Sequence, residues 1–319
     1  MRALVLGATG TAGSAITAAL LGAGHEVHAL VRRADAALPP EVRVHRGEIG
    51  DPNQIAAAAA DTAVIFVAVG LPVGEPAERH RWLHVAGIEN VLSAARHAGV
   101  PRVVLISCAD VVLADEARVH WDEKRDLSHP PIGGRARALK LSEEIALSQS
   151  DAELAVTALR PGWIWGPRDR RLLSLVAEAR SGGLDLCGDG RNLVATTYVE
   201  HLAEAALLAA VSPNAPGNAY YVGDPEFLEV REFLGLLSQT LGLPAPRPGG
   251  PYWLKRLWAG LGRGALPLEE VVRRGRATYF DTQKATTELG FEPKVKIDLG
   301  MKRLADWYAA GGHAASETK

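Results

Sequence analysis

The sequence predicts an α/β protein in which a doubly wound parallel sheet is followed by a smaller, mostly helical C-terminal lobe. Three observations support this fold class: short apolar runs rich in β-branched residues, longer helical stretches that alternate with them, and a change of composition after Leu159. Repeated strand–helix units produce a parallel sheet with right-handed crossovers. The strands are expected at 2–6, 27–31, 42–45, 63–69, 102–107 and 154–159, and the helices at 11–23, 52–60, 78–97 and 135–148.

Each expected strand is a continuous apolar run, as in parallel strands that are buried on both faces. Beyond residue 159 glycine and proline become frequent, and a helix at 199–211, a strand at 218–222 and a Pro/Gly-rich stretch at 242–251 follow. This change of rhythm predicts a second lobe that covers the carboxyl edge of the sheet.

We therefore expect a first domain over 1–165 and a substrate lobe over 166–311, with helix 199–211 packing back on the first domain. Residues 312–319 are expected to form a flexible tail.

The composition excludes several classes of function. The formal net charge is −2 and 47% of the residues are hydrophobic, so no basic surface indicates nucleic-acid binding. The two cysteines, Cys108 and Cys187, are too few for a disulfide framework or a zinc site, and no metal is expected. The apolar run 3–6 is too short for a signal peptide and no run is long enough to span a bilayer, so the sequence predicts a cytoplasmic protein without membrane contact.

A glycine motif follows the first expected strand directly and opens the first expected helix: Gly7, Ala8, Thr9, Gly10, Thr11, Ala12, Gly13. Glycine is needed where the strand turns tightly into the helix and where the backbone approaches a pyrophosphate. The helix N-terminus then presents free N–H groups and its positive dipole to the phosphates. In this position the motif predicts a Rossmann-type site for a nicotinamide dinucleotide.

The end of the second expected strand favours NADP over NAD. NAD-binding proteins carry an acidic residue there that bonds the ribose 2′-hydroxyl. Here that position is Val31, and Arg32 and Arg33 follow it. Guanidinium groups suit a 2′-phosphate, although two arginines in a surface loop would also be compatible with simple solvation.

With these motifs in place, the sequence resembles the extended short-chain dehydrogenase/reductases, in particular the branch of 3β-hydroxysteroid dehydrogenases and sugar-nucleotide epimerases and dehydratases. The resemblance runs along nearly the whole chain through segments whose order and spacing match: 7–13, 47–52, 84–92, 159–167, 188–192, 198–203 and 280–291. It implies a nicotinamide cofactor that touches the glycine motif, the ends of the strands and one lysine, and a homodimer is a further expectation. The cofactor residues it implies beyond those already named are Glu48, Ile49, Ala68, Val69, Lys140, Pro161 and Gly162.

The resemblance fails at the residues that move the proton. In the family a Tyr and a Lys four residues apart share one face of a helix, and a Ser ends the fifth strand. The first tyrosine of this chain is Tyr198, and Lys140 is preceded four residues earlier by Ala136. Cys108 stands at the usual serine position, with Ser107 before it.

We consider Lys140, His84, Cys108 and Ser107 as the catalytic residues. Lys140 would bond the nicotinamide ribose, and His84, at a position where relatives often carry Asn, is a residue type that titrates near neutral pH. His120, His129, Asp110 and an ordered water are further sources of the proton. Each of these residues could equally be structural, since a lone helix histidine or a cysteine at a strand end often is.

The expected substrate contacts are Asp110, Trp163, Trp165 and Arg191. The tryptophans, with Trp121, suggest an apolar or planar substrate, and packing between the lobes is the alternative. The aromatic stretch 251–261, which carries Lys255 and Arg256 beside its apolar side, is expected to pack in the core or to cover the substrate as a lid, and contact with a membrane is the third alternative.

Three functions remain open at this point. The first is an NADP-dependent oxidoreductase that acts on a carbonyl or alcohol of a small, rather hydrophobic metabolite. The second is a lyase, isomerase or cyclase on the same scaffold without net redox turnover. The third is a regulatory protein that binds NADP(H) without catalysis.

Overall fold

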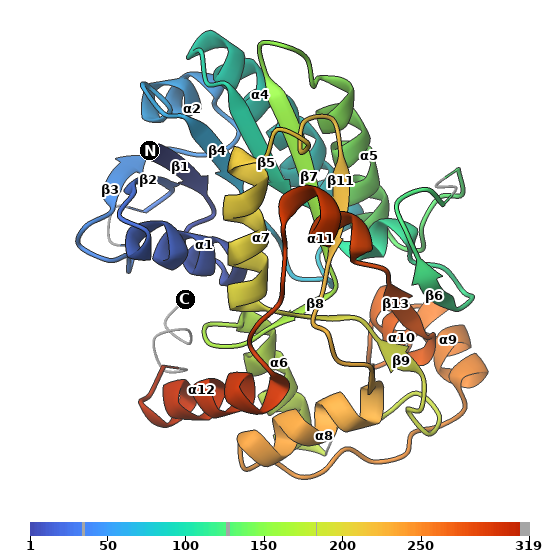
Figure 1. Cartoon of the computed structure of the whole chain (residues 1–319). Helices are drawn as coiled ribbons and strands as arrows, with labels where there is room; N and C mark the ends of the chain where they lie inside the picture. Colours follow the sequence, from blue (N-terminus) through green and yellow to red (C-terminus); the bar gives the residue numbers. More distant parts are fainter. Residues whose placement is uncertain (34–35, 126–127, 183, 313–319) are drawn as a thin grey trace.

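The computed structural model describes residues 1–33, 36–125, 128–182 and 184–312. Its centre is a seven-stranded parallel sheet in the order β11-β7-β5-β4-β1-β2-β3, as Figure 1 shows. The strands are β1 (Arg2–Leu6), β2 (Glu26–Val31), β3 (Arg43–Arg46), β4 (Val64–Val67), β5 (Arg102–Ile106), β7 (Ala155–Pro161) and β11 (Ala219–Val222). The parallel sheet expected from the sequence is confirmed.

Helices cover both faces of this sheet because its buried strands alternate their side chains between two cores. Ala3 and Val5 of β1 pack with α1 (Thr11–Gly22) and α7 (Val199–Val211), whereas Leu4 and Leu6 face the opposite side. That side is covered by three helices: α2 (Pro52–Ala58), α4 (Gly87–His97) and α5 (Gly134–Ser148). The expected helix 78–97 exists but contains a π-helical turn, η1 (Trp82–Ala86), between α3 (Ala77–Arg81) and α4.

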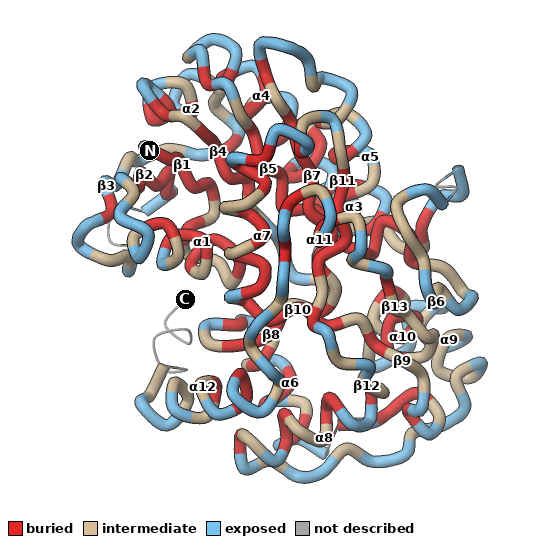
Figure 2. Tube along the Cα trace, viewed as in Figure 1, coloured by how far each residue is buried: buried red, intermediate tan, exposed pale blue. Residues whose placement is uncertain are grey.

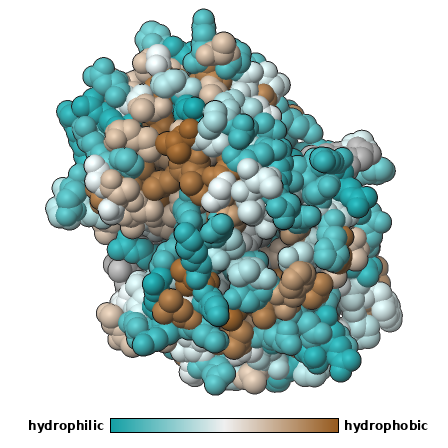
Figure 3. All heavy atoms as spheres, viewed as in Figure 1, coloured by the Kyte–Doolittle hydropathy of each residue, from teal (hydrophilic) through white to brown (hydrophobic). Residues whose placement is uncertain are grey.

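One strand expected in the second lobe belongs to the large sheet. β11 pairs with β7 at the sheet edge, and its four residues are all buried. Helix α7 packs against α1, as the sequence predicted. Its outer side is apolar: Val211 is 61% exposed and Leu207 and Leu208 are half-buried. In Figure 3 the largest brown area of the visible face lies over this end of α7.

The second lobe surrounds a separate core below the carboxyl edge of the sheet. Trp163, Trp165 and Phe233 are among its buried members. The lobe's helices and strands are β8 (Trp163–Trp165), α6 (Arg170–Ser181), β9 (Leu193–Val194), β10 (Thr196–Tyr198), β12 (Leu228–Glu229), α8 (Val230–Thr240), α9 (Tyr252–Gly260), α10 (Leu268–Gly275), β13 (Thr278–Phe280) and α12 (Ile297–Ala309). Helix α11 (Gln283–Leu289) instead packs on β11 and α7 of the first domain, although the sequence predicted it in the second lobe.

Helix α9 lies at the outer edge of this lobe, where Figure 2 shows it in tan and pale blue. None of its residues is buried, and Trp253 is 66% exposed. The core packing expected for the stretch 251–261 is therefore wrong for this helix, whereas the lid and the contact with a membrane stay predictions. No helix in the described part of the chain is long and apolar enough to cross a membrane.

A segment of the first domain joins this lobe. After β5 the chain forms a short 3-10 turn, η2 (Ala109–Val112), and then β6 (Arg118–Trp121), which pairs with β13. Residues 313–319 of the predicted tail lie outside the described residues.

Candidate active site

The glycine motif forms a turn whose conformation only glycine tolerates. Gly7 has a φ of +83°, and a Cβ atom there would lie 2.4 Å from the Ala68 carbonyl oxygen. A Cβ atom on Gly13 would lie 2.1 Å from the Gly7 carbonyl oxygen, so the helix packs directly on the turn. Gly10 precedes α1 without a side-chain cap, which leaves the helix N-terminus open to an anionic ligand. This turn fits the pyrophosphate of a dinucleotide.

A second segment closes on the same turn. Arg170, at the start of α6, donates from its guanidinium to the Thr9 carbonyl oxygen at 2.9 Å. The Thr11 hydroxyl donates to the Arg168 carbonyl oxygen at 3.3 Å. The Arg170 guanidinium therefore lies beside the phosphate turn, and the glycine motif alone does not predict this contact. The signal in the sequence is the run of arginines that follows Gly166-Pro167.

The residues expected to contact the adenosine part of the cofactor lie at the ends of β2 and β3. Arg32 and Arg33 are exposed directly after β2, and Glu48 is exposed after β3. Ile49 is buried, and its carbonyl oxygen accepts a hydrogen bond from the Asn90 amide at 3.0 Å. These positions at the strand ends fit an adenosine ribose.

The ends of β4 and β7 complete this edge. Ala68 and Val69 follow β4 and are half-buried. Pro161 ends β7, and the Gly162 amide donates to the Thr197 hydroxyl at 2.9 Å. A Cβ atom on Gly162 would lie 2.4 Å from the Ala195 carbonyl oxygen, so a side chain at this position would force the two lobes apart.

Helix α5 carries both positions at which the resemblance predicts Tyr and Lys. Ala136 is completely buried on α5. Lys140 Nζ donates to the His129 carbonyl oxygen at 3.2 Å and lies 3.7 Å from the Glu144 carboxylate. The structure thus gives Lys140 partners on its own helix and the preceding loop.

An ion network lies beside this helix where β5 ends. Arg135 Nη1 donates to Asp110 Oδ2 at 2.5 Å, and Arg273 of α10 donates to both oxygens of the same carboxylate. Arg273 also pairs with Glu270, and the Arg135 amide donates to Glu269 Oε1 at 3.0 Å. Burial raises the pKa of Asp110, but the guanidinium groups of Arg273 and Arg135 outweigh it and hold that pKa far below its usual range. Asp110 is therefore ionised and tied to two lobes at once.

The thiol and hydroxyl next to this network differ in what they can do. Cys108 is buried, and burial, reinforced by the Asp110 carboxylate, raises the pKa of its thiol. Such a thiol is a poor nucleophile, because the thiolate is the reactive form. The Ser107 hydroxyl is also buried and has no hydrogen-bond partner among the described residues. An unpaired buried hydroxyl is available to a bound carbonyl.

His84 lies in the π-helical turn, stacked on His80 with ring centroids 5.9 Å apart. Burial, and then the charges of Arg135 and His80, lower the pKa of His84 to about 3. The expectation that this histidine titrates near neutral pH is therefore wrong, because it is enclosed next to a permanent cation. π-Helical turns inside helices are frequent at functional sites.

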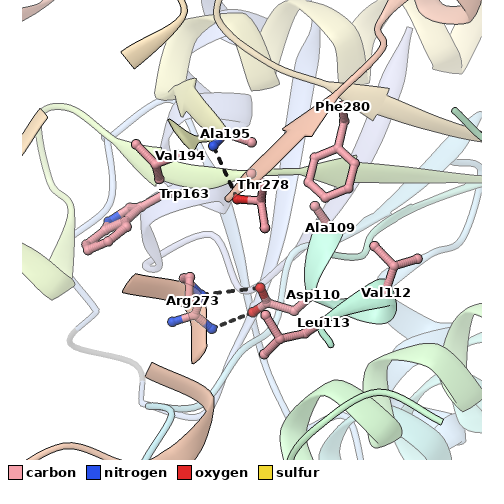
Figure 4. Close-up of a pocket in the computed structure, with 11 residues that line it drawn as sticks. Ala109, Asp110, Val112, Leu113, Trp163, Val194, Ala195, Arg273, Thr278 and Phe280 are labelled. Carbon is pink, nitrogen blue, oxygen red and sulfur yellow. Dashed lines mark hydrogen bonds and ion pairs between the residues drawn. The ribbon is translucent and has the colours of Figure 1, made fainter. Parts of the chain in front are cut away.

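A small cavity of about 20 Å³ opens next to the network, which is room for about one water molecule. Figure 4 shows Arg273 reaching across it to Asp110, with the Trp163 ring on one side and Phe280 on the other. Two of the four expected substrate residues, Asp110 and Trp163, line this cavity.

The other two expected substrate residues do not line it. Trp165 is buried in the second core, where its indole N–H donates to the Asp224 carboxylate at 2.6 Å. Arg191 is exposed, with 66% of its side chain accessible, and lies 3.7 Å from Asp189. Trp165 is therefore a core residue, whereas the substrate contact of Arg191 stays a prediction. Sequence reasoning missed Arg135 and Arg273, although the first directly precedes the vacant tyrosine position.

A family model described as the 3-beta hydroxysteroid dehydrogenase/isomerase family matches residues 4–249. The chain belongs to this family. A 2-alkyl-3-oxoalkanoate reductase of Stenotrophomonas maltophilia is 33% identical, over 95% of this chain and 98% of its own. A 3 beta-hydroxysteroid dehydrogenase/Delta 5-->4-isomerase of Mycobacterium tuberculosis is 30% identical, over 97% of this chain and 90% of its own.

A further relative is the 4-hydroxy-2-methyl-3-oxo-4-farnesyl-3,4-dihydroquinoline-1-oxide ketoreductase of Stigmatella aurantiaca, 30% identical over 98% of both chains. Among solved structures, the UDP-glucose 4-epimerase of Thermotoga maritima superposes with a TM-score of 0.78 at 19% identity, covering 98% of this chain and 99% of its own. These likenesses confirm the extended short-chain dehydrogenase/reductase fold. The protein is an NAD(P)-dependent oxidoreductase of that group.

Proposed function

We propose that this enzyme uses NADP to interconvert a carbonyl and an alcohol on a small, rather hydrophobic metabolite, with Cys108 and Ala136 in place of the usual Ser and Tyr. The observation that carries the proposal is the buried, unpartnered Ser107 hydroxyl, which follows β5 at the carboxyl edge of the sheet, the edge that holds the phosphate turn. The Arg135 guanidinium of α5, which donates to the Asp110 carboxylate, is the second donor of the proposal.

The cofactor, when bound, supplies or accepts a hydride. The residues of the chain then have to stabilise the negative charge that develops on the carbonyl oxygen, which fixed donors in a dry site do effectively. Burial lowers the pKa of Arg135, but its interactions with Cys108 and with the Asp110 carboxylate outweigh burial and raise that pKa above its usual value. Arg135 therefore donates hydrogen bonds without giving up a proton. We assign the proton to water or to a group of the substrate, with His84 present as a neutral imidazole.

The substrate class follows from the cavity and the relatives. Trp163 and Phe280 give the cavity apolar walls, and two relatives reduce ketones that carry alkyl or farnesyl groups, by their names. We propose a ketone of this kind, with a 2-alkyl-3-oxo acid as the first candidate. Because the cavity holds only about one water molecule, α10 and Arg273 have to move outward when the substrate enters.

The cofactor preference is tested by titrating the protein with NADPH and NADH and following nicotinamide fluorescence. The wild type is expected to bind NADPH more tightly. An Arg32→Ala/Arg33→Ala variant should lose about tenfold or more in NADPH affinity and little in NADH affinity, since each lost charge-assisted bond is worth about 1.5–3 kcal/mol. Arg263→Ala, an exposed arginine in the other lobe, serves as the control. Tighter binding of NADH would contradict the preference.

Turnover is tested by following NADPH oxidation with a panel of 2-alkyl-3-oxo acids and cyclic hydrophobic ketones. Ser107→Ala should lower kcat about 100-fold, which is typical for the loss of one donor to a developing oxyanion. Ser93→Ala, an exposed serine on α4, should leave it unchanged. Conversion of a substrate without net NADPH oxidation would favour a lyase or isomerase, and NADPH binding without conversion of any substrate would favour a regulatory protein.

A further inference from the structure

Two consecutive arginines at the start of α6 are directed to different places. Arg170 contacts the phosphate turn, where its guanidinium donates to the Thr9 carbonyl oxygen at 2.9 Å. The guanidinium of Arg171 instead lies over the Trp163 ring, 6.0 Å from its centroid. Trp163 forms one wall of the small cavity beside the ion network, as Figure 4 shows. Arg171 therefore lies on the substrate side of α6, and Arg170 on the cofactor side.

Arg171 is a cation without a counter-ion. It is half-buried, and its guanidinium makes no hydrogen bond or ion pair with any residue that the structure describes. By contrast, Arg135 and Arg273 share the Asp110 carboxylate. Charges that lose part of their water are normally paired in proteins, because an unpaired one costs free energy. An unpaired guanidinium beside a cavity therefore indicates a place for an anion.

The acidic groups nearest to Arg171 are already occupied. Burial raises the pKa of Asp110, but the charges of Arg273 and Arg135, and after them that of Arg171, outweigh burial and lower it. Arg171 thus acts on this carboxylate from a distance, without a hydrogen bond to it. Asp169 accepts from the backbone amide of Arg171 at 2.9 Å and makes no ion pair with its side chain. The five N–H donors of the Arg171 guanidinium remain available to a ligand.

The wall next to Arg171 contains a second donor without a partner. The indole N–H of Trp163 is buried and has no hydrogen-bond partner among the described residues. The indole N–H of Trp165, two residues later, donates to the Asp224 carboxylate at 2.6 Å. A buried donor that finds no acceptor in the protein costs free energy until a water or a ligand supplies one. Both donors therefore indicate a ligand group that accepts hydrogen bonds and carries a negative charge.

We propose that Arg171 binds the carboxylate of the substrate and makes the enzyme prefer acids to uncharged ketones and alcohols. A carboxylate matches the planar fork of a guanidinium with two parallel hydrogen bonds, whereas a neutral ester does not. The inference rests on the proposed function, because it takes the ketone of that proposal and assigns a residue to its acid group. The charge of the carboxylate does not change during the reaction, so the contact lowers KM and leaves kcat unchanged.

The test compares an acid with its ester in the direction of alcohol oxidation, because 3-hydroxy acids, unlike 3-oxo acids, do not lose carbon dioxide in solution. The substrates are 2-butyl-3-hydroxyoctanoate and its methyl ester, and NADPH formation is followed. The wild type should oxidise the acid with a kcat/KM at least about tenfold above that for the ester. Arg171→Gln should raise KM for the acid about 10- to 100-fold, with kcat within about twofold and the ester unaffected.

Two further variants separate charge from geometry. Arg180→Gln removes an exposed arginine from the same helix and should behave like the wild type. Arg171→Lys keeps the positive charge and should recover part of the affinity for the acid, because an ammonium group lacks the planar fork. Thermal melting of Arg171→Gln should show no loss of stability, since the side chain has no polar partner to lose. A loss of stability together with equal losses for acid and ester would show a structural role and overturn the proposal.

A binding measurement keeps this inference separate from the reaction. 2-Butyloctanoate has the acid group but no alcohol to oxidise, and its dissociation constant in the presence of NADPH is measured by calorimetry. Arg171→Gln should weaken its binding about 10- to 100-fold and leave NADPH affinity unchanged. If this holds while neither alcohol is oxidised, the proposed reaction fails and the carboxylate site stands. No binding of 2-butyloctanoate, unchanged binding to the variant, or a loss of NADPH affinity in its place would overturn the assignment of Arg171.

Discussion

The two ends of the sheet's carboxyl edge are specified in different ways. At the β1 end, seven consecutive residues form a turn in which a Cβ atom on Gly7 or Gly13 would collide with backbone. At the β5 end, Asp110, Arg135 and Arg273 come from three separate segments and meet only in the folded chain. The first end is one short turn of the chain, whereas the second is an ion network assembled from distant segments. On the proposed function, cofactor binding depends on local backbone geometry and the chemistry depends on long-range contacts.

The largest expected effect is a loss of stability when the ion network at the β5 end is broken. Asp110→Ala leaves the guanidinium groups of Arg135 and Arg273 buried without their carboxylate, so the free energy of unfolding should fall by about 3–5 kcal/mol. Urea denaturation at pH 7 measures it, with the exposed Asp189→Ala as the control. A loss below about 1 kcal/mol would show that the network is not coupled to the fold. Because the pKa of Asp110 is lowered in the folded state, its contribution is present above about pH 4 and is lost as the pH falls further.

The next effect is a loss of cofactor affinity at the phosphate turn. Gly13→Ala introduces a Cβ atom 2.1 Å from the Gly7 carbonyl oxygen, so the turn has to open. Overpacking of about 1–3 kcal/mol corresponds to a loss of roughly five- to 150-fold in NADPH affinity if the strain falls on the binding geometry. Gly22→Ala, in the same helix with nothing within 4 Å, should bind like the wild type. Equal affinities of the two variants would refute the assignment of the phosphate site.

A third experiment tries to restore the family pattern at the altered end. Ala136→Tyr places a phenol at a completely buried position, so it should lower stability by about 1–3 kcal/mol and should not raise turnover. Leu141→Tyr, at a position that is 38% exposed on the same helix, should be nearly neutral. Thermal melting and NADPH oxidation measure the two effects, and a stable, faster Ala136→Tyr enzyme would show that the site retains the family geometry.

The smallest expected effect is a pH dependence of stability that comes from Asp169. This residue precedes α6, in the segment that contacts the phosphate turn. Burial raises the pKa of Asp169 to about 6, above its value in an unfolded chain. The folded state therefore holds a proton between about pH 4 and 6 that the unfolded state has lost, and stability falls as the pH rises through this range.

Asp169→Asn removes this titration and retains an oxygen that can accept from the Arg171 amide, as Asp169 does at 2.9 Å. The variant should gain stability relative to the wild type as the pH rises from 4 to 6.5, by about 1 kcal/mol, because one pKa unit is worth about 1.4 kcal/mol and local relaxation reduces the full shift. A difference that does not change with pH would contradict the raised pKa.

The same division explains what could be predicted from the sequence. The helix at 199–211 and the strands β1, β2, β4, β5 and β7 follow from apolar runs, whereas β3 is polar and mostly exposed. The phosphate turn follows from seven consecutive residues. Arg273 could not be placed, because its contact with Asp110 joins positions 163 residues apart. His84 was correctly placed on a helix. Its pKa, however, depends on burial and on the charge of Arg135, and the sequence around His84 predicts neither. Trp165 reads like Trp163 in sequence, yet only one of them borders the cavity.

The position of β11 has a consequence for the making of this protein. The edge strand Ala219–Val222 and the helix Val199–Val211 complete the nucleotide-binding half, yet both are translated after most of that half. During synthesis, the first 165 residues leave the ribosome with β7 lacking its neighbour and α1 lacking the helix that covers it. Such an open sheet edge is prone to non-native pairing. A chain truncated after residue 165 should therefore aggregate, whereas one that extends past Val222 holds every strand of the sheet.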